Sequence, residues 1–399
     1  MRKVYMDHSA TTPAHPDVAK IMNEFMVDSF GNASSVHSFG REARNALDKA
    51  RQQVADLIGA EAKEIVFTSG GTEADNHAIK GVAKTYSDKG KHIITTKFEH
   101  HAVLHTCEYL EKEHDFKVTY LPVSKDGYVQ VSDLEEAIRN DTILITVMYA
   151  NNEIGTIQPI KEMAKLAKKE GIIFHTDAVQ GVGVVPIDVK DLEVDLLTLS
   201  GHKFYGPKGV GALFVKKGMK IDPMFHGGSH EMKIRAGTEN VPGIAGIGKA
   251  AEIALHQMKE RSDKIVKLRD KLAEGIIAKI DHVQINGGMD NRLPGNLNVS
   301  IAYVEGEALL LNLDQKGIAV SSGSACTSGS LDPSHVLLAI DLPHELAHGS
   351  LRLTLGAGNS EQDVDYVLNE LPEIVVRLRS MSPLYEETKK SEKEGCAHV

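Results

Sequence analysis

Short apolar runs that alternate with helix-like stretches constrain the fold of this chain more than any other feature of its sequence. The runs are rich in Ile, Leu, Val and Thr, and they cover residues 65–68, 92–96, 143–149, 172–175 and 196–199. Helix-like stretches such as residues 161–169 separate most of them. Strands that alternate with helices predict a mostly parallel β-sheet that is buried on both faces, and therefore an α/β protein.

Two helices are predicted from the spacing of their apolar residues. Residues 41–58 carry apolar side chains on one face, and Gly59 supplies a stop. A longer, charged helix covers about residues 250–279, and separate strands and helices follow it. At 399 residues the chain is long enough for one large and one smaller domain, and this long helix is the predicted boundary between them.

Composition excludes several classes of function. Lys and Arg number 45 against 55 Asp and Glu, and no stripe concentrates the basic residues, which argues against nucleic acid or an anionic membrane as partner. No apolar run approaches the roughly 20 residues of a membrane helix, and the start resembles no signal peptide, so we expect a cytoplasmic protein. Cys107, Cys326 and Cys396 are too few and too scattered for a disulfide framework.

Chemistry-bearing residues follow three of the predicted strands. Residues 69–73 read SGGTE after the first strand, Asp177 follows the fourth and Lys203 follows the fifth. Ligands of open parallel sheets bind outside the carboxyl ends of the strands, so we expect these residues to converge. The glycine turn would offer helix N–H groups to a phosphate. Lys203 could bond to an aldehyde anchored by that phosphate, and Asp177 could keep a pyridine nitrogen protonated.

Each of these residues also has an ordinary structural interpretation. The glycine turn lacks a Walker lysine and the GxGxxG spacing, so alone it is a common strand-to-helix turn. Asp177 alone would be a helix cap and Lys203 a solvent-facing lysine. Their combination favours the catalytic interpretation.

Six segments, in this order, resemble the pyridoxal-phosphate-dependent cysteine desulfurases of the NifS/IscS group: SGGTEADN, MYANNEIG, HTDAVQ, SGHKFYGPKG, RAGTEN and SSGSACTSGS. The similarity covers residues 3–385. It implies a fold-type-I transferase with a mostly parallel seven-stranded sheet. It also implies a division into three parts: a large domain over 15–260, a small α/β domain over 1–14 and 261–385, and a flexible tail over 386–399.

The same resemblance assigns the site residues. Lys203 would hold the cofactor, Asp177 would pair with its pyridine nitrogen, and His100 would stack on its ring and assist proton transfers. Gln180 and Asn152 would hydrogen-bond near the phenolic oxygen. Residues implied to hold the phosphate are Gly71, Thr72, Ser200, His202 and, from the second subunit of a homodimer, Thr238. Arg352 would bind the substrate carboxylate, together with Asn152; its alternative role is a surface salt bridge.

Cys326 lies in SSGSACTSGS, ten residues without a large side chain, and we therefore expect residues 321–332 to form a mobile loop. The resemblance implies that this longer form of the loop carries a persulfide. In the implied reaction Lys203 removes the α-proton of L-cysteine, Cys326 attacks the substrate sulfur, and alanine leaves. The sulfur then passes to an iron–sulfur scaffold or another acceptor, and Cys326 could transiently ligate a cluster or metal. Cys107 is predicted to pack in a helix, and Cys396 to be a bystander.

Other functions remain open at the level of sequence. An aminotransferase or a selenocysteine lyase would retain Lys203 and Asp177, and a catalytically silent sulfur-relay protein would be a non-enzyme alternative. His344 to His348 match HExxH, a zinc-binding pattern. Pro343 and Gly349 bracket that pattern so closely that we predict a helix of little more than one turn, and we assign no metal.

Overall fold

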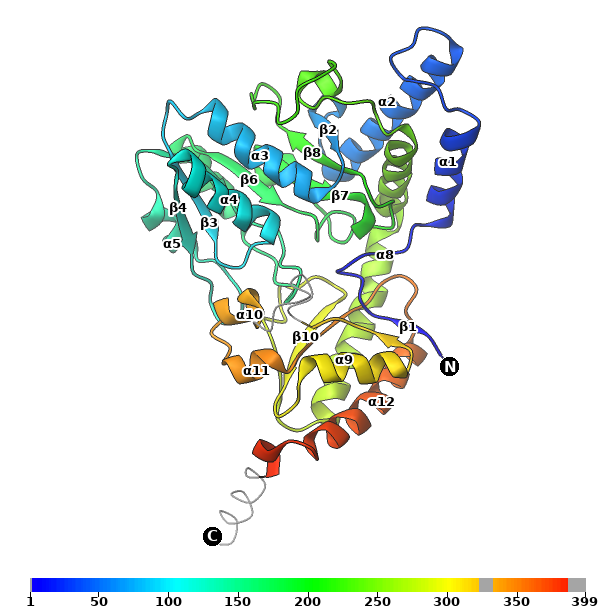
Figure 1. Ribbon diagram of the computed structural model, residues 1–399, viewed down its shortest axis with the longest axis vertical. Coiled ribbons are helices and arrows are strands. Elements are labelled where there is room, and N and C mark those ends of the chain that lie inside the picture. The colour runs from blue at the N-terminus through cyan, green and yellow to red at the C-terminus, as the bar shows by residue number, and fades with distance from the viewer. Residues whose placement is uncertain (1, 323–332, 387–399) are drawn as a thin grey trace.

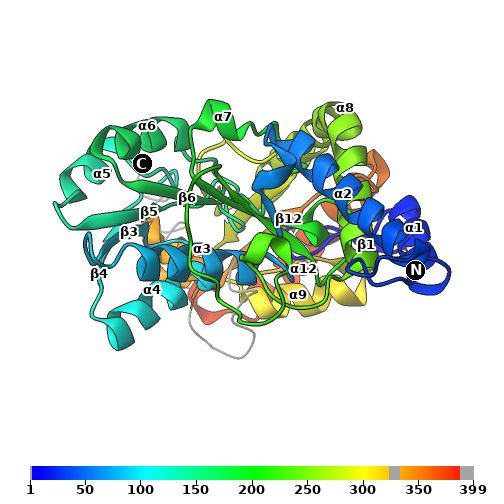
Figure 2. The same ribbon diagram turned by 90° about the horizontal axis from the view of Figure 1, so that it is seen from above.

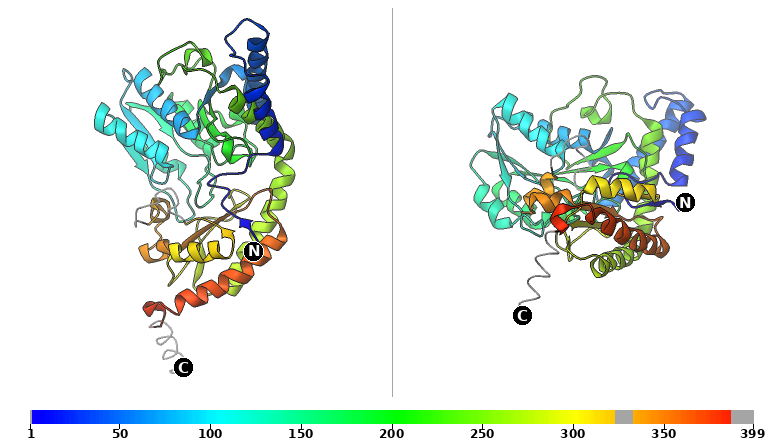
Figure 3. Two further views of the ribbon diagram at one scale, coloured as in Figure 1. Left: turned by 45° about the vertical axis from the view of Figure 1, so that its right-hand side comes forward. Right: turned by 60° about the horizontal axis from the view of Figure 1, so that its bottom comes forward.

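The computed structural model describes residues 2–322 and 333–386. Cys326, Cys396, most of the predicted loop and the predicted tail beyond Glu386 lie outside these residues. The protein has a large upper part and a smaller lower part, and one long helix, α8 (Val241–Lys279), runs through both (Figures 1 and 3).

A seven-stranded sheet forms the centre of the larger part. In spatial order its strands are β2 (Ile65–Thr68), β8 (Gly211–Val215), β7 (Leu196–Ser200), β6 (Ile173–Asp177), β5 (Thr142–Thr146), β3 (His92–Thr96) and β4 (Lys117–Leu121). All neighbours pair in parallel except β8, which is antiparallel to both β2 and β7. The predicted mostly parallel sheet is confirmed.

Helices cover both faces of this sheet, as the view from above shows (Figure 2). On one face α3 (Gly71–Thr85) and α4 (His101–His114) share a core with the strands. The core of the other face includes α2 (Ser38–Ile58) and α6 (Ile160–Glu170) with the first half of α8. Shorter or peripheral helices complete this part of the chain: α1 (Pro16–Val27), η1 (Ala62–Glu64), α5 (Val131–Ala137), α7 (Val189–Leu192), η2 (Gly201–Lys203) and η3 (Glu231–Lys233).

The smaller part has its own apolar core, formed by the second half of α8, α12 (Glu361–Arg379) and α9 (Gly306–Gln315) around an antiparallel sheet. That sheet has the order β12 (Ser350–Thr354), β10 (Asn296–Ile301), β9 (Val283–Ile285). β1 (Val4–Tyr5) pairs in parallel with β11 (Ile318–Ala319), so the N-terminus returns to this part. Two short helices, α10 (His335–Ala339) and α11 (His344–His348), precede β12. The proposed domain limits stay a prediction.

Several predicted boundaries are wrong. β6, predicted over 172–175, covers Ile173–Asp177, so Asp177 ends the strand and does not follow it. α8 begins at Val241, because Asn240 caps it and accepts a hydrogen bond from the Gly243 N–H, whereas the apolar spacing became regular only from residue 250. β5 ends at Thr146 although the apolar run continues to Tyr149, since the chain leaves the sheet there. α2 begins at Ser38, three residues before the predicted start.

Two predictions about single segments are confirmed. Cys107 is completely buried in α4, and burial raises the pKa of its thiol, so it packs as a small apolar residue. The HExxH residues form α11, a helix of only five residues between Pro343 and Gly349. Within residues 2–322 and 333–386, no cluster of three His, Cys, Asp or Glu side chains is placed to hold a metal ion. Nor does any helix of that region combine the length and apolarity needed to cross a membrane.

Candidate active site

A cavity of about 290 Å³ opens at the carboxyl ends of the central strands. Its lining includes every predicted site residue of the described regions except Thr238: Gly71, Thr72, His100, Asn152, Asp177, Gln180, Ser200, His202, Lys203 and Arg352. These residues come from both parts of the molecule, because Arg352 belongs to β12 and the others to the larger part. The fold therefore brings together the strand-end residues and Arg352, which the family resemblance assigned to the substrate carboxylate.

Lys203 ends η2, the single turn that follows β7, and its side chain lines the cavity. Its Nζ donates hydrogen bonds to the carbonyl oxygens of Ser9, at 2.5 Å, and Ala10, at 2.9 Å. The amine is thus held inside the site by the N-terminal segment. A solvent-facing loop lysine, the alternative interpretation, does not describe this position.

Asp177 is the last residue of β6 and is only 6% exposed. Burial raises the pKa of this carboxyl to about 6, while a hydrogen bond from the Val179 N–H at 2.9 Å and the charge of Lys203 lower it. A turn, and no helix, follows Asp177. The helix-cap interpretation is therefore wrong, because the N–H that this carboxylate binds belongs to a turn and no helix begins there.

Asp75 and His175 lie beside Asp177 and were missed by the sequence analysis. The Asp75 Oδ1 atom is buried without a hydrogen bond, 3.7 Å from His175 Nε2. Burial and then the charge of Asp177 raise the pKa of Asp75, and burial lowers the pKa of His175 to about 3. Asp75 follows the glycine turn on α3, and His175 lies inside β6, so only the fold makes them neighbours of the site.

The glycine turn forms the N-terminus of α3, which begins at Gly71. The first N–H groups of a helix lack intrahelical acceptors and favour an anion. A Cβ atom at Gly71 would lie 2.8 Å from Val179 Cγ2, so a larger residue here would have to displace the Val179 side chain. His202 also lines the cavity; its Nδ1 lies 3.1 Å from the Thr11 hydroxyl, and burial lowers its pKa to about 4.

His100 caps α4, where its Nδ1 atom accepts a hydrogen bond from the Ala102 N–H at 3.1 Å. Burial and then the charge of Lys203 lower the pKa of His100 to about 4. The imidazole is therefore neutral near pH 7. A neutral ring is suited to stacking against an aromatic group.

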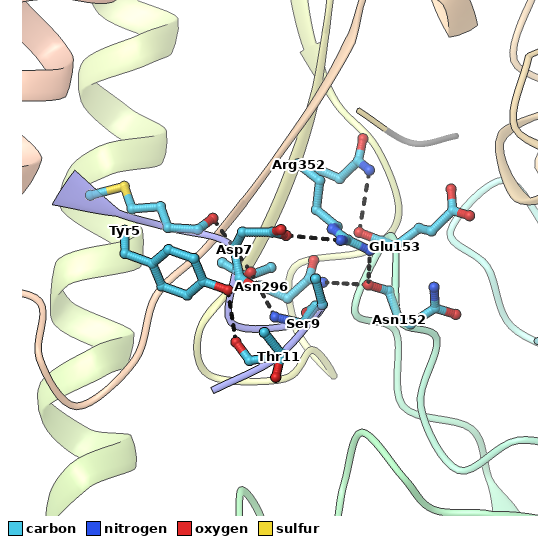
Figure 4. A network of polar contacts seen from close by, with 12 residues as sticks. Tyr5, Asp7, Ser9, Thr11, Asn152, Glu153, Asn296 and Arg352 are labelled. Carbon is cyan, nitrogen blue, oxygen red and sulfur yellow. Dashed lines mark hydrogen bonds and ion pairs between the residues drawn. The ribbon is translucent and has the colours of Figure 1, made fainter. Parts of the chain in front are cut away.

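Arg352 is 2% exposed, so it forms no surface salt bridge. Its Nη1 donates to the Asn152 carbonyl oxygen at 3.2 Å, and its Nη2 contacts Asp7 Oδ1 at 3.0 Å (Figure 4). Gln180 donates from Nε2 to the Ser9 carbonyl oxygen at 3.0 Å. Together with the Lys203 contacts, these bonds make residues 7–10 part of the site. The sequence analysis assigned no role to these residues.

Thr238 behaves differently from the other predicted residues. It is exposed on the segment between η3 and α8 and does not line the cavity of its own chain. That position is compatible with the expected contribution to a second subunit.

Comparisons with known proteins agree with the geometry. The sequence model of the Aminotransferase class-V family matches residues 4–367. The cysteine desulfurase IscS of Methanosarcina thermophila is 58% identical over 383 residues, which cover 96% of this chain and 94% of that protein. A NifS-like protein has a similar solved structure, with a TM-score of 0.89 and 40% identity over 94% of this chain and all of that one.

A second solved structure, SspA in complex with cysteine, has a TM-score of 0.80 and 39% identity over 90% of this chain and all of that one. The chain therefore belongs to the class-V aminotransferase family and, within it, to the NifS/IscS group of cysteine desulfurases.

Proposed function

We propose that this protein is a pyridoxal-phosphate-dependent cysteine desulfurase, which converts L-cysteine to L-alanine and keeps the sulfur as a persulfide on Cys326. The observation that carries the proposal is the single cavity shared by Lys203, Asp177 and Arg352. It is supported by the cysteine desulfurase relatives and by the SspA structure, which was solved with cysteine.

The residues of the cavity fit pyridoxal phosphate. A primary amine, a buried carboxylate and a helix N-terminus face one space, and the lack of a side chain at Gly71 keeps that N-terminus open. When bound, the cofactor supplies an aldehyde that reacts with amines and a ring that withdraws electrons. Lys203 would hold the aldehyde, and Asp177 would hold a proton at the pyridine nitrogen.

The remaining contacts follow from the same assignment. His100 would lie against the ring, and Gln180 and Asn152 near its phenolic oxygen. The phosphate would be held by Gly71, Thr72, Ser200, His202 and Thr238 of the partner subunit.

Substrate binding and proton transfer would be divided among three groups. The guanidinium of Arg352 binds the α-carboxylate of L-cysteine, for which a planar, buried cation is well suited. The Lys203 amine, released when the substrate amine takes its place, removes the α-proton. His100, neutral near pH 7, can accept or return a further proton.

Sulfur transfer would then require the Cys326 thiol. Its sulfur attacks the substrate sulfur, a sulfur–sulfur bond forms, and the carbon–sulfur bond breaks. The three-carbon product takes up protons and leaves as L-alanine, so cysteine plus thiol gives alanine plus persulfide with no added oxidant. The sulfur passes on to an iron–sulfur scaffold protein or another thiolation acceptor.

A homodimer is part of the proposal. Thr238 is exposed, and apolar side chains on and near α1 are exposed as well: Met26, Val27, Phe30, Val36 and Phe39. Ser34 and Glu239 line one open depression, so the apolar segment and the Thr238 segment lie near each other. A second copy on this face would cover the apolar side chains and could carry its Thr238 toward the cavity.

Two measurements test the proposed function. The purified protein should bind pyridoxal phosphate with a visible absorption band, and borohydride should fix the cofactor to Lys203. Incubation with L-cysteine should yield alanine, and sulfide only when a thiol reductant is present. A protein that binds no cofactor, or that transfers the amino group to a keto acid without releasing sulfur, would refute the proposal. Parallel assays with L-selenocysteine test the lyase alternative.

A further inference from the structure

Arg352 is a buried cation, and each of the three nitrogen atoms of its guanidinium has a different environment. Nη1 donates to the Asn152 carbonyl oxygen and Nη2 to Asp7, while Nε is buried without a hydrogen-bond partner. The backbone of Arg352 is fixed in β12 and exchanges two hydrogen bonds with Ser321. The guanidinium is thus held firmly, yet part of its donor capacity is still unused.

Asp7 supplies the negative charge next to this cation. It follows β1, and its backbone bridges to Thr354, two residues beyond Arg352 on β12. The Asp7 carbonyl oxygen accepts hydrogen bonds from the Tyr5 hydroxyl and the Ala10 N–H, both at 3.0 Å. These backbone contacts hold Asp7 in place without the help of Arg352. Arg352 lines the cavity but Asp7 does not, so the carboxylate approaches the guanidinium from outside the cavity.

This arrangement has an electrostatic consequence for ligands. A carboxylate that enters the cavity meets a guanidinium already paired at 3.0 Å, and the two negative charges repel each other across a poorly solvated space. Substrate and product carry the same α-carboxylate, so Arg352 binds both. A cation without a counter-ion would bind both more tightly and would slow the departure of the product, because uniform binding does not accelerate the reaction.

We propose that Asp7 is a positioning residue that orients Arg352 and, through its charge, weakens the hold of this guanidinium on the α-carboxylate shared by L-cysteine and L-alanine. The proposal rests on the proposed function. It adds a group that touches neither substrate nor cofactor, and it assigns that group an effect on ligand release.

The test uses the holoenzyme and L-alanine, whose binding is followed by the visible absorption of the cofactor. Asp7→Asn and Asp7→Ser remove the charge, and Asp7→Glu retains it. Arg2→Gln is the matched control, since it breaks the Arg2–Asp363 ion pair in the same N-terminal segment and neither residue of that pair contacts the Arg352 guanidinium. Ethylamine, which lacks the carboxylate, is the control ligand.

Asp7→Asn and Asp7→Ser should bind L-alanine about tenfold more tightly than wild type, whereas ethylamine binding should not change. KM for L-cysteine should fall in these variants, and kcat should fall with it as alanine leaves more slowly. Asp7→Glu and Arg2→Gln should retain wild-type alanine affinity.

Unchanged or weaker alanine binding by the charge-removing variants overturns the proposal. If neither variant folds even with saturating L-alanine, the proposal is also overturned, because the carboxylate of the bound alanine should then take the place of the missing Asp7 charge. If the wild-type protein binds the cofactor but neither alanine nor cysteine, the proposed function itself is wrong, and so is the proposed role of Asp7.

Discussion

Glu99 and His175 are fully buried polar residues next to the site that no sequence motif predicted; the charge of Asp177 acts on Glu99, and His175 lies two residues before Asp177 on β6. Lys203, Asp177 and Arg352 could be predicted because each stands in a motif or directly after a strand. Glu99 precedes His100 but its side chain turns into the protein, where Oε1 accepts hydrogen bonds from the Thr96 hydroxyl and the Met148 N–H. Only the packing of neighbouring strands reveals such a buried polar group.

A prediction at this scale concerns the protonation of Glu99. Burial raises its pKa to about 8 from an ordinary value of 4.5. The folded state therefore retains a proton that the unfolded chain releases, so Glu99 contributes stability that is full below pH 4.5 and is lost as the pH rises toward 8. Glu99→Gln should remove this loss, and its stability relative to wild type should rise between pH 5 and 8 in denaturant titrations. If the stability difference between Glu99→Gln and wild type did not change with pH, Glu99 would not be a buried neutral acid.

His175 gives the opposite pH dependence. Burial lowers its pKa to about 3 from 6.5, so between these values the unfolded chain binds a proton that the folded chain does not. Its contribution to stability is full above pH 6.5 and falls by about 1.4 kcal/mol per pH unit as the pH decreases. His175→Gln should lose less stability than wild type between pH 6.5 and 5. Equal slopes for the two proteins in urea titrations would show that His175 is not responsible.

At the scale of elements, the sequence predicted strands better than the loops that make the site. β2 and β3 have the predicted limits, because Ile, Val and Thr stop where polar residues or glycine begin. The run at 143–149 misled the strand prediction, since Val147 and Met148 are buried beyond the end of β5, and Met148 lines the cavity. The role of residues 7–10 depends on contacts across about 190 residues of chain, which no local pattern encodes.

The turn into α3 provides a prediction for one element. Gly71→Ala should weaken pyridoxal phosphate binding about tenfold, because the new methyl group lies 2.8 Å from Val179 and must shift that wall of the cavity. Gly358→Ala is the control, since a Cβ there meets nothing within 4 Å. Titration of the cofactor-free proteins by visible absorption measures both. Wild-type affinity in Gly71→Ala would show that this turn does not hold the phosphate.

At the scale of the whole molecule, the proposed site would be complete only in the proposed dimer. The larger part contributes Lys203 and Asp177, the smaller part Arg352, and the second subunit would contribute Thr238. Sequence resemblance alone led to this arrangement, because no pattern within one chain reveals a residue that acts in another.

Mixed dimers test this arrangement. Lys203→Ala and Thr238→Ala proteins should each be weakly active or inactive, Thr238→Ala through a weaker hold on the cofactor phosphate. After unfolding and refolding together at limiting cofactor, activity should return to about a quarter of the wild-type value, since half the dimers are mixed and each has one complete site. Each variant refolded alone is the control. No recovery, despite mixed dimers detected by native mass spectrometry, would show that Thr238 does not act across the subunit interface, and full activity of Thr238→Ala alone would place it outside the site.

The most direct test of the central claim is a single turnover without reductant. The holoenzyme is mixed with one equivalent of L-cysteine, alanine is quantified, and peptides are analysed for the added mass of one sulfur atom. Wild type should yield equal amounts of alanine and of persulfide on Cys326, whereas Lys203→Ala and Cys326→Ser should yield neither. Full alanine formation by Cys326→Ser, or sulfur found on Cys107 or Cys396 in its place, would contradict the account.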